Sequence, residues 1–173
     1  VVTYYSDGIF SPEKIVDLAV EHGLECISLT DHDNILSYDV AKKHIEDNGI
    51  NLELIQGVEI NTLYKSMEVH ILGYFMDVKN KDFQNMLKAQ QQARIVQTKE
   101  ILSLLNKKEG IKIKFEDVTN MVAEGGSIGR PHIAKAITNV GGTSNVMEAY
   151  SKYIHKDSPV YIERKTVSPF DTT

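Results

Sequence analysis

The sequence predicts an α/β fold, with a mostly parallel sheet and crossover helices joined to a helical segment. Over the first 80 residues, short apolar runs alternate with helical patterns, which is typical of such sheets. From about 80 to 157 helical spacing dominates. Apolar residues make up 42% and charged residues 25% of the 173 residues, which is an ordinary globular composition. One domain carrying a small insert fits this length.

The first half reads as helix, strand, helix, strand, strand. Ser11-Pro12-Glu13 combines an N-cap residue, a proline suited to the first helical turn and an acidic side chain. Gly23 ends this first helix. A strand over about 26–29, a helix over about 37–48 and strands over about 52–60 and 68–75 are expected to follow.

The second half changes character. Apolar residues recur at helical spacing over 82–109, which predicts one long helix or two helices with a bend. Further helices are expected from Phe115, over 131–139 and over 146–153, and strand-like alternation resumes at Val160-Tyr161-Ile162. We therefore expect three segments, namely a first α/β part over 1–79, a helical insert over 80–157 and a return to the first part over 158–173.

Several classes of protein are excluded or disfavoured. Cys26 is the only cysteine, so an intramolecular disulfide and the Cys₂ and Cys₄ zinc patterns are excluded. No stretch approaches the ~18 apolar residues of a membrane span, and no basic segment leads into an apolar signal region. We expect a cytoplasmic protein with no membrane association and no protein partner.

The net charge of −5 is unevenly distributed. Residues 1–87 hold 6 Lys and Arg against 15 Asp and Glu, a balance of −9. Residues 88–165 hold 13 against 8, a balance of +5. An acidic half suits cations and a basic half suits phosphate groups, although both can also be solvated faces.

Polar residues in apolar surroundings mark a candidate site. Asp31-His32-Asp33 directly follows a short apolar strand, where the alternative is a loop with an Asp as helix cap. Glu59 lies in an apolar strand, where a buried carboxylate is costly unless it is paired or binds a cation, although it can also occupy a solvent face. His70 lies in another such strand, where a lone imidazole is more often a hydrogen-bonded core group. Carboxylates and imidazoles together suit Mn²⁺, Zn²⁺ or Fe²⁺.

Two further motifs are weaker. Gly129-Arg130-Pro131-His132 opens a helix, and a helix N-terminus with a flanking arginine can bind an anion. The alternative is a proline-initiated helix with an exposed arginine. Ser6-Asp7-Gly8 is a turn by composition.

Taken in order, four blocks resemble the PHP (polymerase and histidinol phosphatase) family of metal-dependent phosphoesterases. The T-x-x-SDG pattern matches Thr3-Tyr4-Tyr5-Ser6-Asp7-Gly8, and the TDHD pattern matches Leu29-Thr30-Asp31-His32-Asp33. The GvEi pattern matches Gly57-Val58-Glu59-Ile60, and the HiLGy pattern matches Val69-His70-Ile71-Leu72-Gly73-Tyr74. The stretch 129–134, and Tyr153 with Pro159-Val160-Tyr161, resemble the bacterial branch that acts on nucleoside 3′,5′-bisphosphates and RNA 5′ ends.

This resemblance implies a distorted (β/α)₇ barrel with a small helical insert domain, and two or three divalent metal ions, most often manganese, with zinc or iron as alternatives. It implies metal ligand roles for Asp7, His32, Glu59 and His70. Catalytic roles fall on His32 and Glu59, and on Asp31 as a group that orients His32. Arg130 and His132 would hold a substrate phosphate of a nucleotide or short RNA. The implied reaction is hydrolysis by metal-activated water.

The match has gaps. Val2 stands where the second histidine of the family's Asp-Leu-His-x-His block belongs, and the later Ala-His-Pro and Asp-x-His blocks would lie beyond Thr173. Two explanations stay open, namely a truncated piece of a larger enzyme with an incomplete barrel, or a degenerate nucleotide- or RNA-binding module that does not cleave. A histidinol-phosphatase-like small-molecule phosphatase is a further alternative.

Overall fold

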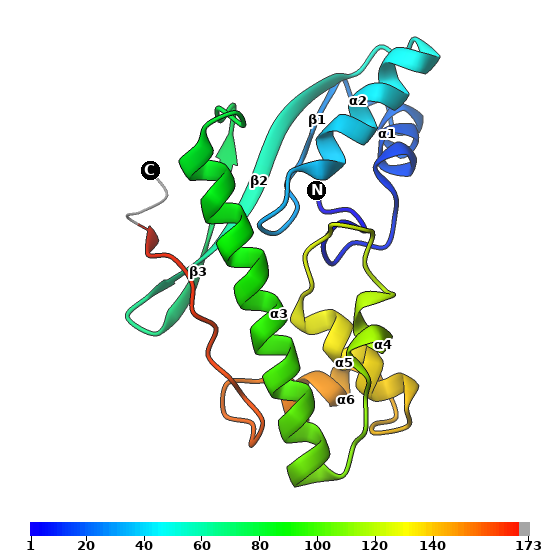
Figure 1. Cartoon of the computed structure of the whole chain (residues 1–173). Coiled ribbons are helices and arrows are strands. Elements are labelled where there is room, and N and C mark those ends of the chain that lie inside the picture. The colour runs from blue at the N-terminus through cyan, green and yellow to red at the C-terminus, as the bar shows by residue number, and fades with distance from the viewer. Residues whose placement is uncertain (170–173) are drawn as a thin grey trace. The chain divides into compact units, whose positions relative to one another are not determined.

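A computed structural model describes residues 1–169, and the chain divides into two compact units (Figure 1). Of the described residues, unit 1 comprises 1–90, 123–127 and 166–169, and unit 2 comprises 91–122 and 128–165. The last four residues of the expected return segment, 170–173, lie outside the described residues.

Unit 1 is built on a three-stranded sheet in the order β1-β2-β3. β1 (Cys26–Leu29) runs parallel to β2 (Glu53–Tyr64), and β3 (Met67–Tyr74) is antiparallel to β2. The sheet is therefore mixed rather than mostly parallel, because the two-residue loop between β2 and β3 is too short for a crossover helix. Lys65 and Ser66 form this loop with φ values of 47° and 62°, as in a type I′ turn.

Helices α1 (Pro12–Glu21) and α2 (Leu36–Asn48) share one core with β1. The Ser11 side chain accepts a hydrogen bond from the Lys14 N–H at 3.3 Å and caps α1, as predicted. Gly49 ends α2 with φ 59°, a left-handed conformation that glycine adopts without steric cost. The buried residues of this core are Val16, Ala19, Ile27, Leu29, Ala41 and Leu52.

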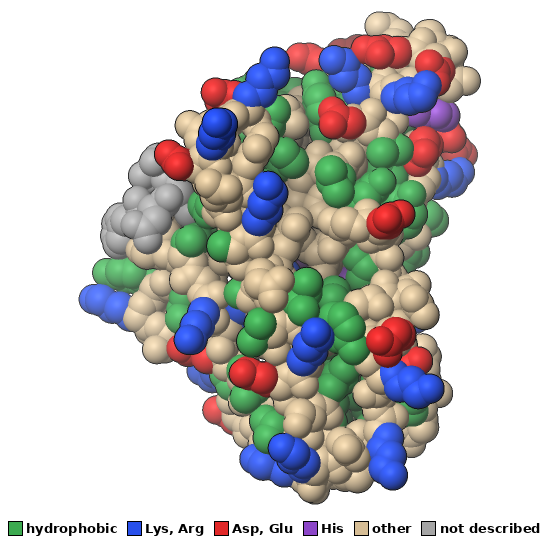
Figure 2. All heavy atoms as spheres, viewed as in Figure 1, with side chains coloured by type: hydrophobic (Ala, Val, Ile, Leu, Met, Phe, Trp, Pro, Cys, Tyr) green, Lys and Arg blue, Asp and Glu red, His purple; other side chains and the backbone are tan. Residues whose placement is uncertain are grey.

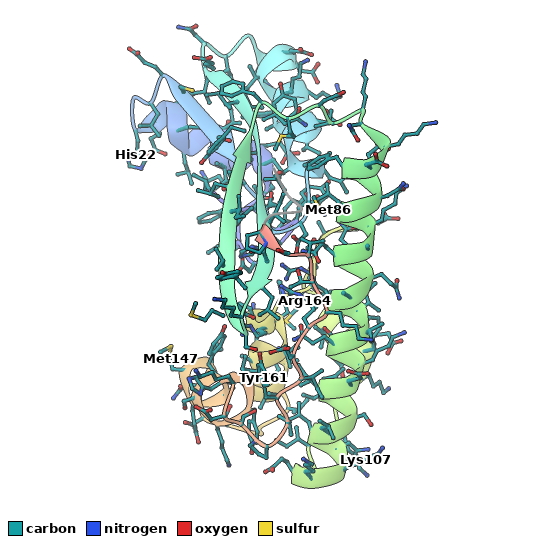
Figure 3. All side chains as sticks on the ribbon, turned by 90° about the vertical axis from the view of Figure 1, so that its left-hand side faces the viewer. His22, Met86, Lys107, Met147, Tyr161 and Arg164 are labelled. Atoms are coloured by element: carbon teal, nitrogen blue, oxygen red, sulfur yellow. The ribbon has the colours of Figure 1, made fainter. Side chains whose placement is uncertain are left out.

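Helix α3 (Lys81–Glu109) is one helix of 29 residues, which settles the choice between one helix and two. Its first part packs on β2, where Leu87 forms a buried cluster with Val58 and Ile60. Met86 lies on the side of α3 toward the strands (Figure 3). Because successive strand residues point to opposite faces, Glu59 projects from the face of β2 opposite to Val58 and Ile60.

The described residues of unit 2 are helical or irregular. Besides the rest of α3, they form α4 (Phe115–Thr119), α5 (Arg130–Asn139), and α6 (Val146–Ala149) continued by a π-helical turn, Tyr150–Ile154. The strand expected at 160–162 is a wrong prediction, because this segment is irregular and Val160 is buried in the helical core of unit 2. Within residues 1–169, no helix is long and apolar enough to cross a lipid bilayer.

Candidate metal centre

The register of the sheet brings three predicted site residues onto one face. Just beyond the end of β1, His32 forms a parallel bridge with Glu59. Across the β2–β3 pair, Glu59 is opposite Leu72 and Asn61 is opposite His70, so His70 is the diagonal neighbour of Glu59. The backbone alone therefore gathers His32, Glu59 and His70.

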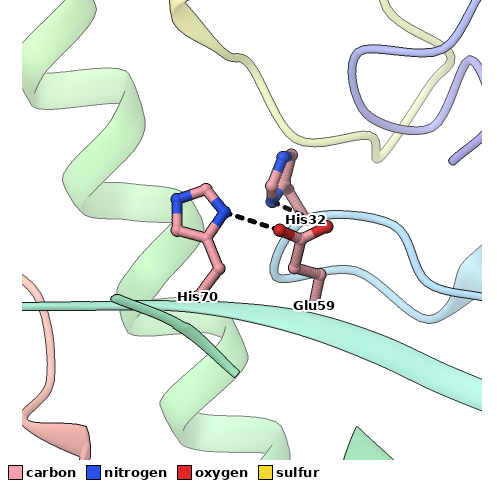
Figure 4. Close-up of side chains that lie close together, drawn as sticks. All are labelled: His32, Glu59 and His70. Atoms are coloured by element: carbon pink, nitrogen blue, oxygen red, sulfur yellow. Dashed lines mark hydrogen bonds and ion pairs between the residues drawn. The ribbon is translucent and has the colours of Figure 1, made fainter. Parts of the chain in front are cut away.

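The Glu59 carboxylate lies between the two imidazole rings (Figure 4). Its Oε1 is 2.5 Å from His70 Nδ1, and its Oε2 is 3.8 Å from His32 Nδ1. The ring centroids of His32 and His70 are 5.2 Å apart, with the planes at 88°. One ligand atom from each of the three residues lies within 4.8 Å of the other two, which is close enough for all three to bind cations after small side-chain movements.

One atom of this cluster is incompletely satisfied. Among the described residues, the buried His32 Nδ1 has no hydrogen-bond partner, although a carboxylate oxygen lies 3.8 Å away. A buried polar atom without a partner costs about 1–3 kcal/mol, and a cation between the two groups would remove that cost. Imidazole and carboxylate donors suit divalent transition metals. The residues present therefore fit a metal ion.

Asn61 holds His70, a role that sequence reasoning missed. Its Nδ2 lies 2.7 Å from His70 Nε2, on the side of the ring away from Glu59. An amide offers a donor and an acceptor, so Asn61 can fix the ring both before and after Nδ1 binds a cation. The backbone N–H of Asn61 donates to Asp33 Oδ1 at 3.1 Å, which fixes Asn61 in turn. The spacing of two residues from Glu59 in a strand was the available signal.

Asp31 holds the turn over residues 3–8. Its Oδ1 accepts hydrogen bonds from the Thr3 N–H at 2.7 Å and the Ser6 hydroxyl at 2.6 Å, and its Oδ2 accepts from the Thr3 hydroxyl at 2.8 Å. The side chain has no exposed surface. This carboxylate therefore positions the turn, and its expected role in orienting His32 stays a prediction.

That turn carries Asp7 to the other nitrogen of His32. Asp7 Oδ2 is 3.5 Å from His32 Nε2, whereas Glu59 faces Nδ1. Gly8 closes the turn, because a Cβ there would lie 2.6 Å from the Val2 carbonyl oxygen. In the same turn, burial and then the neighbouring Tyr4 raise the pKa of Tyr5, so its phenol stays neutral at physiological pH.

Arg130 and His132 lie in the first turn of α5, in unit 2. Pro131 occupies the start of the helix, and the Gly129 N–H donates to His132 Nδ1 at 2.9 Å. His132 is buried and Arg130 is half-buried. His132 thus acts as a helix cap through one nitrogen, and phosphate binding by both residues stays a prediction.

A family model for the PHP domain matches residues 1–166. The chain belongs to the PHP domain family. This membership confirms the resemblance on which the ligand assignment of Asp7, His32, Glu59 and His70 rests, while the roles themselves stay predictions.

Curated relatives are similar to this chain in sequence over part of their own length. The 5′-3′ exoribonuclease Rnm of Salmonella typhimurium is 30% identical over 160 residues, which is 92% of this chain and 54% of that protein. The Rnm of Escherichia coli is 31% identical with the same coverage. The 3′,5′-nucleoside bisphosphate phosphatase of Chromobacterium violaceum is 24% identical over 163 residues, which is 94% of this chain and 56% of that protein. The chain spans about half the length of these relatives.

Solved structures share the fold. A provisionally assigned metal-dependent phosphoesterase from Bifidobacterium adolescentis has a TM-score of 0.87 and 31% identity, covering 96% of this chain and 58% of that one. An amidohydrolase from C. violaceum has a TM-score of 0.86 at 23% identity, covering 99% and 59%. The α/β fold class and the PHP architecture are thereby confirmed.

Proposed function

We propose that the protein is a metal-dependent phosphoesterase that hydrolyses phosphate esters of nucleotides or of RNA 5′ ends, with nucleoside 3′,5′-bisphosphates as small substrates. The observation that carries this proposal is the cluster of His32, Glu59 and His70 in a PHP-family chain. Relatives named as a 5′-3′ exoribonuclease and a 3′,5′-nucleoside bisphosphate phosphatase support this substrate class.

The mechanism assigns a task to each side chain of the cluster. Glu59 offers one oxygen toward each imidazole, so it would hold divalent cations together with His32 and His70, and manganese is the metal that the family resemblance implies. When bound, divalent cations lower the pKa of a water molecule and neutralise charge on phosphoryl oxygens. His32 and His70 supply neutral nitrogen donors, and Asp7 lies beside His32 as a further ligand or as the partner of its second nitrogen.

Arg130 and His132 are proposed to hold the substrate phosphate. A guanidinium binds phosphate through two parallel hydrogen bonds, and the first turn of a ten-residue helix adds partial positive charge.

We place the protein in the cytoplasm, because its single cysteine, the exposed Cys26, is a free thiol.

Metal content tests the centre directly. The chain is dialysed against Mn²⁺ and then against buffer, and manganese per chain is measured by elemental analysis for the wild type and for Glu59→Gln. We expect at least one retained ion in the wild type and its loss in the variant. Glu68→Gln, an exposed glutamate of β3, is the matched control and should retain the metal. No retained manganese in the wild type would overturn the proposal.

Activity separates the competing substrate classes. With Mn²⁺, a nucleoside 3′,5′-bisphosphate and a 5′-phosphorylated oligoribonucleotide should be hydrolysed faster than histidinol phosphate. The reverse order would favour the small-molecule phosphatase. Nucleotide binding with no metal requirement and no hydrolysis would favour a non-catalytic binding module.

A further inference from the structure

Unit 2 contains a pocket of about 510 Å³ between the second half of α3 and the segment 112–117. Its apolar surface is formed by Leu102, Ile113 and Phe115. Its cationic side chains are Lys99, Lys112 and Lys114, all of them exposed. Over this part of the molecule, Figure 2 shows hydrophobic side chains at the surface among Lys and Arg. The volume lies within the range of about 300–1,000 Å³ that small-molecule sites occupy.

The pocket carries a net positive charge. Asp117 is the acidic residue that lines it, and its Oδ2 already accepts a hydrogen bond from the Lys114 N–H at 2.9 Å. Lys114 is in an extended conformation, with φ −79° and ψ 152°. Residues two apart on an extended segment project to the same side, which places Lys112 and Lys114 together. Three ammonium groups beside one engaged carboxylate favour an anionic ligand.

An aromatic ring forms part of the same pocket. Lys99 Nζ lies 4.8 Å from the centroid of the Phe115 ring, while Phe115 also packs against the hydrophobic core of unit 2. One part of the ring is therefore anchored, and its face meets a flexible, exposed lysine. Such a cation–π contact is worth only about 0.5–1 kcal/mol at an exposed site, so a planar ligand can replace it.

We propose that this pocket binds a nucleoside phosphate, either as a free mononucleotide or as one unit of a single-stranded RNA. The base stacks on Phe115 and displaces the ammonium group of Lys99. Lys99, Lys112 and Lys114 then take the phosphate. Base stacking on an aromatic ring beside a cationic groove is the general mode of single-strand recognition. The choice of nucleotides as the ligand class rests on the proposed function, but binding here requires no metal.

Fluorescence anisotropy tests this inference on the full chain. The probe is a 5′-phosphorylated oligoadenylate of eight nucleotides with a 3′ fluorophore, in EDTA so that it is not hydrolysed. The triple variant K99Q/K112Q/K114Q is compared with K135Q/K152Q/K156Q, which removes the same charge from exposed lysines of unit 2 outside the pocket. We expect at least tenfold weaker binding in the first variant, and no more than a twofold change in the second.

Salt dependence and stacking give independent readouts. The slope of log K against log salt is negative, and its magnitude should fall by about 0.7 for each phosphate that the first variant no longer neutralises. Phe115→Leu keeps an apolar contact with the core, and circular dichroism checks that it is folded. It should weaken binding about fivefold or more, with an unchanged salt slope. Equal losses of affinity in both triple variants, or full affinity in Phe115→Leu, would overturn the inference.

Competition identifies the source of the ligand. Displacement of the probe by AMP, but not by inorganic phosphate, supports a mononucleotide site. Displacement only by unlabelled oligoadenylate supports an RNA-binding site. Displacement by inorganic phosphate as readily as by AMP would overturn the stacking role of Phe115. Binding of the probe in EDTA together with no hydrolysis in Mn²⁺ would overturn the proposed phosphoesterase activity but not the nucleotide site. Failure of the activity is therefore distinguishable from failure of the pocket proposal.

Discussion

Replacing Asp31 with alanine should strongly destabilise unit 1. The carboxylate has no exposed surface and accepts three hydrogen bonds from Thr3 and Ser6. A buried donor left without a partner costs about 1–3 kcal/mol. The Thr3 N–H would be left without a partner, and the two hydroxyls would lose their hydrogen bonds to a charged group, so we expect a total loss of about 3–5 kcal/mol. Asp31→Asn keeps an oxygen for the two donors at Oδ1 and should lose about 1–2 kcal/mol.

Urea unfolding in EDTA, followed by circular dichroism and tyrosine fluorescence, measures these losses without any contribution from metal. The chain has eight tyrosines and no tryptophan, and Tyr4 and Tyr5 lie in the turn that Asp31 holds. Asp47→Ala is the control, because this exposed aspartate pairs with Lys43 on the surface of α2 and should contribute less than about 1 kcal/mol. The reasoning is refuted if Asp31→Ala is no less stable than Asp47→Ala.

Three further changes test the site and the sheet. Asn61→Ala should lower Mn²⁺ affinity, measured by calorimetry, about 10–100-fold, because Asn61 fixes the His70 ring. Asn48→Ala, which removes an asparagine–histidine pair on α2, should leave the affinity unchanged, and wild-type affinity in Asn61→Ala would contradict the role of Asn61. Gly57→Ala would place a Cβ 2.4 Å from Ser28 Oγ and should lower the free energy of unfolding, measured by thermal unfolding, by about 1–3 kcal/mol. Gly73→Ala, where the nearest atom to the new Cβ is at 3.3 Å, should lower it less, and equal losses in the two variants would argue against a steric cause. Lys65→Asn with Ser66→Gly should raise the free energy of unfolding by about 1 kcal/mol, because these residues favour the positive φ of the turn; a decrease would speak against that geometry.

The helices were predictable because their signals are local. Ser11 and Pro12 begin α1, and Gly49 ends α2, through contacts within one or two turns of the chain. The hairpin between β2 and β3 was not foreseen, because Lys65-Ser66 lacks the Asn or Gly that marks a type I′ turn. The apolar alternation at Val160 was misread as a strand, because burial against helices gives the same pattern over three residues.

Some residues of the site were predictable from the sequence and others were not. His32, Glu59 and His70 stood out in the sequence because ionisable side chains are unusual beside apolar strands. Asn61 did not stand out, since an asparagine carries no charge and its value depends on lying opposite His70 in the register. The task of Asp31 was also hidden, because Thr3 and Ser6, which it holds, are more than 20 residues away along the chain.

The β2–β3 hairpin has a consequence for the order of folding. It holds Glu59, Asn61 and His70 within one pair of strands joined by a two-residue turn. Hairpins form in about 1–10 µs, whereas His32 must close a longer loop through parallel pairing. We therefore expect two of the three donors to come together before the third. A divalent cation can capture this hairpin early, so Mn²⁺ should accelerate folding of unit 1 as well as slow its unfolding.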